Sequence, residues 1–309
     1  MRDIVIGVDQ SAASGHVLDR AMAEASSTHR PVRVLHAWSA PVWVGGPSAI
    51  GYASMPSSKD NSGWAKELAD TMLARARDAT PSAVAVDSST EGPEGHAGDT
   101  LVRASMEAGL LVIGGPSHGG LAGALLGSTT SYALHHSTCP VMVVPTTACD
   151  TAFRRVIVGF DDSPCSRSAL RWALDAAHRH NCPLVVVHAL HLTQLGSQLP
   201  TALLYPDYEE GLKVWLDSEV ASAKTGLDDS RLSTEVREGS ASEVLMTEAG
   251  SGDLLVVGSR GHGGFASLML GSVATQCAQH SRGVVVIVRA GNERLEDQQG
   301  LTAASVRTR

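Results

Sequence analysis

Residues 3–11 read DIVIGVDQS, and residues 155–163 repeat them as RVIVGFDDS. Two further segments recur in the same order: VRVLHAW at 32–38 returns as LVVVHAL at 184–190, and LLVIGGPSHGGLAGALLGS at 110–128 returns as LLVVGSRGHGGFASLMLGS at 254–272. A chain that repeats itself over such a distance contains two copies of one structural unit. The sequence therefore predicts a tandem duplication.

Each copy alternates short apolar runs with segments of helical spacing. The runs, rich in Val, Ile and Leu, lie at 4–8, 32–36, 83–87, 110–113 and 141–144, and then at 156–160, 184–188, 232–237, 254–257 and 284–288. Segments such as 14–27 and 64–79 separate them and have the spacing of helices. Continuous apolar runs indicate strands covered on both faces, and alternation with helices indicates parallel crossovers. We expect two α/β domains, each a five-stranded parallel sheet with helices on both faces.

The repeats also give the expected domain boundaries. We expect a first domain at 1–148, a linker at 149–152, a second domain at 153–290 and a disordered polar tail at 291–309. Two segments rich in Gly, Pro, Ser and Tyr, 39–61 and 191–207, are expected to form long loops over the carboxyl edge of each sheet.

Composition excludes several classes of partner. A net charge of −8 provides no basic surface for a nucleic acid or an anionic membrane. Residues 108–149 carry no charged side chain, but Gly, Pro, Ser and Thr interrupt this stretch before 18 apolar residues accumulate. The N-terminus has no signal-peptide pattern, so we expect a cytoplasmic protein without membrane insertion. The five cysteines form no C-x-x-C pair, which suits reduced thiols.

Ligands of open α/β sheets bind beyond the carboxyl ends of the strands. The first strand of each copy ends there in a carboxylate, Asp9 or Asp161, followed by Ser11 or Ser163 at the start of a helix. An Asx turn with a serine N-cap needs the same residues, so a purely structural role stays open.

The second strand of each copy ends in His-Ala, at His36-Ala37 and His188-Ala189. A histidine in such a place more often has a structural role than a metal to bind. The free backbone N–H and C=O at a strand end can, however, match the donor and acceptor on the edge of an adenine.

A glycine-rich stretch follows the fourth strand of the second copy and reads Gly258-x2-Gly261-x9-Gly271-Ser272. Glycines let the backbone approach a ligand closely, and free N–H groups in the loop and at the next helix start attract anions. The alternative is a plain glycine-rich loop with a serine N-cap. The occurrence in two copies after a buried strand favours phosphate binding.

These features together resemble the universal stress protein family, in the arrangement with two family domains on one chain. The resemblance covers about residues 3–145 and 154–289. It implies two tandem Rossmann-like domains of the adenine nucleotide alpha hydrolase-like type. Members that bind ATP carry G-x2-G-x9-G-(S/T). In the first copy the pattern is partly changed, since Pro116 replaces Arg260 and Ser117 replaces Gly261.

The resemblance implies which residues contact ATP. They are Val8, Asp9, Ala37, Gly114, Gly127, Ser128 and Thr129 in the first copy, and Phe160, Asp161, Ala189, Gly258, Arg260, Gly261, Gly271, Ser272 and Val273 in the second. Mg²⁺ is expected to accompany the nucleotide. No catalytic or metal-binding residue is assigned.

The main hypothesis is a nucleotide-dependent stress-response regulator with little or slow hydrolysis and an unidentified protein partner. The alternatives are a slow ATPase or nucleotide-activating enzyme, and a dimerising scaffold without nucleotide. No lysine stands beside a glycine-rich loop, and no G-x-x-x-x-G-K-(S/T) motif is present, which argues against fast phosphoryl transfer. The apolar fifth strands, 141–144 and 284–288, are expected to pair in an intramolecular pseudo-dimer, and a homodimer through other surfaces stays open.

Overall fold

The computed structural model describes residues 2–11, 13–39, 58–79, 85–116, 126–148, 152–190, 208–223, 228–262 and 269–290. The chain divides into two compact units, Met1–Thr151 and Ala152–Arg309. The predicted linker residues 149–151 and the predicted tail 291–309 lie outside the described residues.

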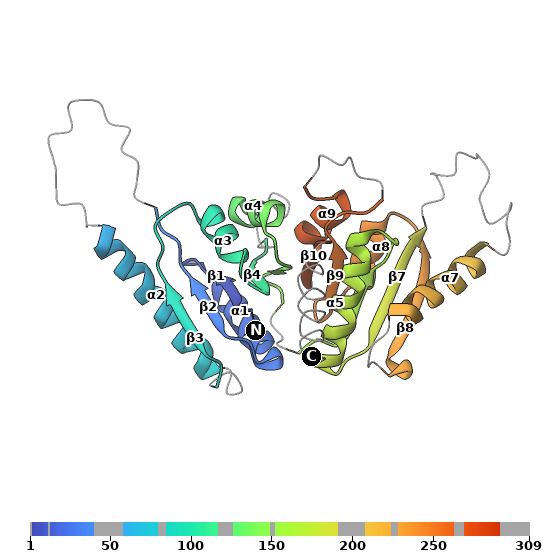
Figure 1. The fold of residues 1–309 in the computed structure, drawn as a ribbon, viewed down its shortest axis with the longest axis horizontal. Coiled ribbons are helices and arrows are strands. Elements are labelled where there is room, and N and C mark those ends of the chain that lie inside the picture. Colours follow the sequence, from blue (N-terminus) through green and yellow to red (C-terminus); the bar gives the residue numbers. More distant parts are fainter. Residues whose placement is uncertain are drawn as a thin grey trace, which may run out of the picture. The chain divides into compact units, whose positions relative to one another are not determined.

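The first unit is a parallel α/β fold (Figure 1). Its elements are β1 (Ile4–Gly7), α1 (Ala13–Thr28), β2 (Val32–Leu35), α2 (Ser58–Ala79), β3 (Ser88–Glu91), α3 (Ala97–Ser105), β4 (Leu110–Gly114), α4 (Ser128–His136) and β5 (Val141–Val144). The strands lie in the order β3-β2-β1-β4-β5, and the registered pairs are parallel. The order reverses between β1 and β4, which places the crevice of an open sheet at their carboxyl ends.

The second unit repeats this topology. Its elements are β6 (Val156–Gly159), α5 (Pro164–His180), β7 (Leu184–Leu190), α7 (Tyr208–Ala223), the 3₁₀ turn η3 (Asp229–Arg231), β8 (Leu232–Glu238), α8 (Ala241–Glu248), β9 (Leu254–Gly258), α9 (Ser272–His280) and β10 (Val284–Val288). The strand order is β8-β7-β6-β9-β10, again with parallel pairs. The predicted α/β fold with parallel sheets is thereby confirmed.

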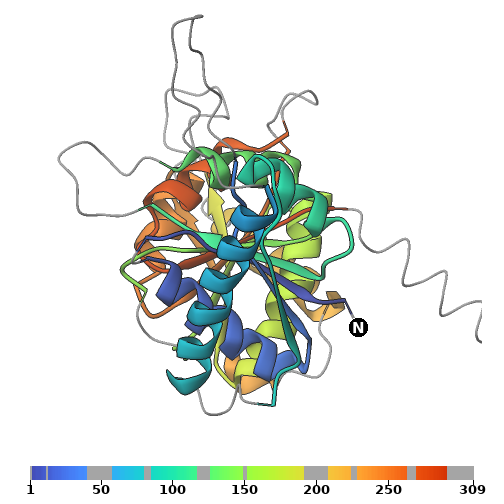
Figure 2. The ribbon, with the colours of Figure 1, turned by 90° about the vertical axis from the view of Figure 1, so that its left-hand side faces the viewer.

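Helices cover both faces of each sheet. In the first unit α1 packs against α2, and α3 against α4; α1 and α2, in two shades of blue, lie in the foreground of Figure 2. Right-handed crossovers explain why the two pairs lie on opposite faces. The connections that contain α1 and α2 run toward the β3 edge of the sheet, whereas those that contain α3 and α4 run toward the β5 edge. The strands between them are aliphatic and buried; the side chains of Ile4, Ile6 and Leu111, for example, are 0% exposed.

Local sequence explains where α5 begins and ends. Ser163 caps the helix by accepting a hydrogen bond from Ser166 N (3.2 Å), and Pro164 occupies the first turn, where its missing N–H costs nothing. Asn181 ends the helix in a left-handed conformation (φ 52°), which asparagine tolerates better than most residues.

Two predicted boundaries in the first unit are wrong. The third strand is not at 83–87: the described residues 85–87 form a turn, and β3 starts at Ser88. β3 is a polar edge strand in which only Thr90 is buried, so the apolar pattern pointed to the wrong segment. The predicted loop 39–61 also extends too far, because α2 already starts at Ser58; residues 40–57 of that loop, and the loop 191–207, lie outside the described residues.

Two chemical expectations can be compared with the described residues. No helix in the described part of the chain is long and apolar enough to cross a membrane. The four described cysteines, Cys139, Cys165, Cys182 and Cys277, are buried free thiols.

Candidate functional site

Because β6 ends before its neighbour β7, the last residues of β7 have no partner strand on the side of β6. β6 ends at Gly159, opposite Val187, and the N–H of Phe160 donates to the carbonyl O of Val187 (2.9 Å). Backbone groups of successive residues point to alternate sides of a strand, so Ala189 directs its N–H and C=O toward the side on which β6 has ended. Ala189 therefore offers one donor and one acceptor at the crevice.

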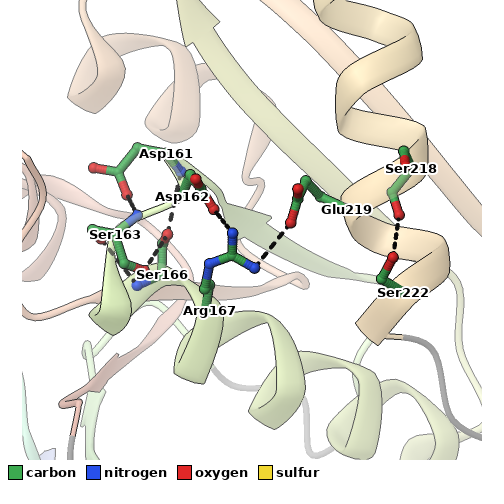
Figure 3. A network of polar contacts seen from close by, with 8 residues as sticks. All are labelled: Asp161, Asp162, Ser163, Ser166, Arg167, Ser218, Glu219 and Ser222. Carbon is green, nitrogen blue, oxygen red and sulfur yellow. Dashed lines mark hydrogen bonds and ion pairs between the residues drawn. The ribbon is translucent and has the colours of Figure 1, made fainter.

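Asp161 joins the start of α5 to the loop that follows β9. Its Oδ1 accepts a hydrogen bond from Ser163 N (3.0 Å; Figure 3). Its Oδ2 accepts one from His262 N (3.4 Å). The N–H of Asp161 donates to Ser166 Oγ (3.3 Å). The carboxylate is thus held from two separate segments of the chain.

These contacts keep Asp161 ionised. Burial by itself raises the pKa of Asp161, but hydrogen bonds from Ser163, Ser166 and His262 outweigh it and lower the pKa below the ordinary 3.8. An ionised carboxylate is a strong acceptor for hydroxyl donors such as those of a sugar.

The glycines after β9 are required for space. A β-carbon on Gly258 would lie 2.8 Å from the carbonyl C of Cys165 and 2.9 Å from Ser166 N, because the first turn of α5 packs directly on this strand end. A β-carbon on Gly261 would overlap with Oδ2 of Asp161. Among the described glycines, those with positive φ are Gly95 and Gly239, so Gly258 and Gly261 are needed for space and not for a left-handed backbone.

The start of α9 lies beside the loop that follows β9. The N-cap residue is Gly271, which carries no capping side chain, and the helix has no side-chain cap hydrogen bond. Gly271 N donates to Ser259 O (2.8 Å), and this bond fixes the helix start beside the loop. The N–H groups at the beginning of such a helix attract an anion.

A cavity of about 100 Å³ lies among these elements. Of the nine residues predicted for the second copy, seven line it: Phe160, Asp161, Ala189, Gly258, Arg260, Gly261 and Val273. Gly271 and Ser272 are not among the lining residues but stand at the start of α9, next to Val273. The structure therefore brings the predicted residues of the second copy to one place.

Several residues of this place were not predicted. Ala241 and Leu245 of α8 form an apolar wall, and Ser166 adds a hydroxyl at the start of α5. The spacing of Ala241 and Leu245 is helical and is typical of any core-facing helix, so it carries no signal of a ligand. Ser166 had a weak signal in the Ser-x-x-Ser spacing with Ser163.

His188 has the structural role that the sequence analysis favoured. Its Nδ1 lies 2.9 Å from the carbonyl O of Phe160, so this nitrogen carries the hydrogen. The ring packs edge-on against Trp215 of α7 at 5.2 Å between centroids, and Trp215 also lies 5.8 Å from the ring of Phe160. The histidine and the tryptophan thus support the backbone where β6 ends beside β7.

The first unit repeats the carboxylate and the histidine. Oδ1 of Asp9 accepts hydrogen bonds from Ser11 N (2.9 Å) and Ser14 Oγ (2.8 Å). Burial raises the pKa of Asp9, but these serines, with His36, lower it overall. Nδ1 of His36 lies 3.0 Å from the carbonyl O of Val8.

The first unit also has a counterpart of the backbone donor and acceptor at Ala189. Val8 N donates to Leu35 O (3.0 Å), so by the same alternation Ala37 directs its backbone groups past the end of β1.

The glycine-rich loop is where the two units differ. Among the described atoms, the one nearest to a β-carbon on Gly114 would be Cγ2 of Val17, at 3.7 Å. The corresponding Gly258 has no such room, because a β-carbon there would lie 2.8 Å from the carbonyl C of Cys165. The N-cap residue of α4 is Gly127, and Ser128 and Thr129 are the first residues of this helix. Like α9, it has no side-chain cap hydrogen bond. Ser117 and the rest of 117–125 lie outside the described residues.

In the described ranges no group of three or more His, Cys, Asp or Glu side chains is arranged to hold a metal ion.

Comparison with known proteins assigns both units to one family. The universal stress protein family matches residues 1–145 and 152–289. A universal stress protein of Mycolicibacterium smegmatis is 32% identical over 289 residues, covering 93% of this chain and 96% of that protein. One of Mycobacterium tuberculosis is 28% identical over 299 residues, with the same coverage.

Solved structures agree on the fold. The crystal structure of a universal stress protein from Archaeoglobus fulgidus has a TM-score of 0.66 at 18% identity and covers 94% of this chain and 98% of that one. A functionally unknown protein from Pseudomonas aeruginosa has a TM-score of 0.63 at 16% identity, with 98% of both chains covered. With the family matched in both halves and the parallel sheets in place, the chain belongs to the universal stress protein family.

Proposed function

We propose that this chain is an ATP-binding regulator of a stress response, acting in the cytoplasm, and that its second unit holds the stronger nucleotide site. One observation carries the proposal. A backbone donor and acceptor at Ala189 and an ionised carboxylate at Asp161 line one cavity, and the uncapped start of α9 adjoins it through Val273. Each suits one part of a nucleotide: base, ribose and phosphates.

In this proposal the base lies against Ala189, with Leu245 as an apolar wall. Asp161 accepts hydrogen bonds from the ribose hydroxyls. The cavity of about 100 Å³ is too small for a whole nucleotide, so the phosphates extend out of it along the glycine loop toward α9. Backbone N–H groups, Ser272 and the exposed Arg260 supply donors there.

Mg²⁺ would arrive with the nucleotide, because this ion is usually bound through phosphate oxygens, water and one or two carboxylates. Its charge would neutralise part of the phosphate charge. We propose that hydrolysis is slow, since the chain has no lysine next to its glycine-rich loops in sequence. Occupancy by ATP, rather than turnover, would be the signal that a partner protein reads.

In this proposal each of the two domains, residues 1–148 and residues 153–290, is a five-stranded sheet with its own nucleotide site. Antiparallel pairing of β5 with β10 and a homodimer stay predictions. Light scattering of the purified protein tests the dimer, and an experimental structure of the whole chain tests the pairing.

Mass spectrometry of small molecules released from freshly purified protein tests the function directly. We expect an adenine nucleotide. Calorimetric titration with ATP then compares the wild type with Gly271→Glu, which places a carboxylate at the phosphate end, and with Gly211→Glu on the open face of α7 as a control. Gly271→Glu should remove one binding event and Gly211→Glu none. Absence of both released nucleotide and binding heat would favour the scaffold, and product formation at enzyme rates would favour the enzyme.

A further inference from the structure

The loop between β6 and α5 contains a non-glycine residue in the left-handed conformation. Asp162 has φ of 66°, a region that residues with a β-carbon avoid unless their surroundings hold them there. It stands between Asp161, whose carboxylate reaches the crevice, and Ser163, which caps α5. The direction of Asp161 therefore depends on how Asp162 is held.

Arg167 holds it. Its guanidinium makes an ion pair with Oδ1 of Asp162 and, through Nη1, a second one with Oε2 of Glu219 on α7 (2.9 Å). Figure 3 shows the carboxylates of Asp161 and Asp162 pointing to opposite sides of the loop, with Arg167 on the side of Asp162. A cation in the first turn of a helix is disfavoured by the helix dipole, and these two carboxylates compensate for it.

α7 meets the same loop at a second point. Trp215, one turn before Glu219, lies against the rings of Phe160 and His188. The residues just before and just after Asp161 are thus both connected to α7, one by aromatic packing and the other through Arg167.

We propose that Arg167 is a positioning residue for nucleotide binding in the second unit: its ion pairs with Asp162 and Glu219 fix the loop so that Asp161 presents its carboxylate to the ribose. This inference rests on the proposed function. It adds that the affinity of the second site depends on α7, an element that lines no part of the cavity described here.

The first unit has no such arrangement. The positions that correspond to Asp162 and Arg167 are Gln10 and Gly15. Gln10 is not in the left-handed region, which among the described non-glycine residues holds only His29, Asp162 and Asn181. Loss of the ion pairs should therefore affect only the second site.

The binding test uses the whole chain with Gly127→Glu, so that calorimetry with ATP reports on the second unit. We expect Arg167→Gln to weaken ATP binding about tenfold, as loss of a charged contact does. Arg171→Gln, an exposed arginine one turn further along α5, should have no effect, and Arg167→Lys should recover part of the loss. In an Asp161→Asn background Arg167→Gln should cost less than about twofold, because the residue acts through Asp161. An equal loss in both backgrounds, or no loss, overturns the inference.

A second measurement needs no nucleotide and separates this inference from the proposed function. Glu219→Gln removes a negative charge, which by charge alone lowers the pKa of Asp161. If Glu219 acts by holding Arg167, its loss frees the loop, weakens the hydrogen bonds from Ser163 and His262, and raises that pKa. We expect a rise in the NMR titration of the Asp161 carboxyl. An unchanged or lowered pKa contradicts the positioning role even if ATP binds, and a rise supports it even if ATP does not.

Discussion

A β-carbon on Gly261 would overlap with Oδ2 of Asp161, so the glycine and the carboxylate depend on each other. The same Oδ2 accepts the N–H of His262 at 3.4 Å, which draws the loop after β9 onto Asp161. The backbone of Gly261 is not in the left-handed region, so the requirement is for space alone. Any larger residue at 261 must displace the loop or the carboxylate.

Gly261→Ala should therefore weaken ATP binding to the second unit by about tenfold, because displacing a charged acceptor removes about one good hydrogen bond. Calorimetric titration measures the change. Gly211→Ala is the matched control, since no described atom lies within 4 Å of a β-carbon at that position in α7. Unchanged affinity in Gly261→Ala would show that Asp161 is not placed by this contact.

Much of the fold and of the site could be predicted because both depend on local pattern and on repetition. Asp161, Ala189 and Gly258 each follow a buried apolar run in the sequence, and parallel strands end at one edge, so their convergence needs no knowledge of packing. β3 was misplaced because an edge strand such as 88–91 has only one buried position and shows no apolar run.

Other features depend on tertiary contacts that spacing does not reveal. Arg167 meets Glu219 across 52 residues of sequence, and nothing in either segment indicates the pair. The glycine pattern predicted close approach of the Gly261 backbone to a ligand, whereas Asp161, 100 residues away in sequence, is the described neighbour that leaves no room for a side chain at this position. Both the ion pair and the lack of space at Gly261 come from packing between separate elements.

Stability at low pH should depend on Asp161. Its pKa in the folded protein lies below 3.8, so its contribution to the free energy of unfolding is present above the unfolded pKa and is lost as the pH falls through the folded pKa. The difference between wild type and Asp161→Asn in urea denaturation should shrink from about pH 5 to about pH 3.

Asp19→Asn provides a control of opposite sign. Burial raises the pKa of Asp19, with smaller opposing effects from His16 and Arg75, so its contribution is lost as the pH rises instead. The free energy of unfolding of the wild type, relative to that of Asp19→Asn, should therefore increase as the pH falls over the same range. Parallel pH profiles for the two variants would contradict the assignment.

Two thiols should resist alkylation in the folded protein. Burial raises the pKa of both Cys139 and Cys277 to about 12, and only thiolates react fast. Iodoacetamide near pH 8 should leave both unmodified in native protein and modify both in urea, as peptide mass spectrometry can show. Fast native modification of either cysteine would mean that its element opens readily.

Hydrolysis of ATP should be slow. In the proposed site only backbone N–H groups, Ser272 and one arginine would meet the phosphates, and they supply little stabilisation that is specific to the transition state. We expect a kcat well below ~1 s⁻¹, the lower end of the ordinary enzyme range. Release of labelled phosphate measures it, with Gly271→Glu as the background control. A rate that Gly271→Glu does not reduce belongs to a contaminant, and a rate in the ordinary range refutes the prediction.

The two nucleotide sites should be unequal, with tighter binding of ATP in the second unit. Pro116 replaces Arg260, which removes a backbone N–H and a guanidinium that can meet a phosphate. Ser117 replaces, in the sequence, Gly261, the glycine that leaves room for Asp161 in the second unit. Both changes weaken the first site, while Asp9 keeps its ionised carboxylate.

Titration of ATP into Gly127→Glu and Gly271→Glu separates the two sites. Each glycine is the N-cap residue before its helix, and a β-carbon meets only ordinary contacts at Gly271, with Ser259 O at 3.4 Å, and no described atom within 4 Å at Gly127. Both variants should therefore fold, while the added carboxylate repels the phosphates. Gly271→Glu should remove the tighter binding event and Gly127→Glu the weaker one. If Gly127→Glu removes the tighter binding event and Gly271→Glu retains it, the assignment of the two sites is reversed.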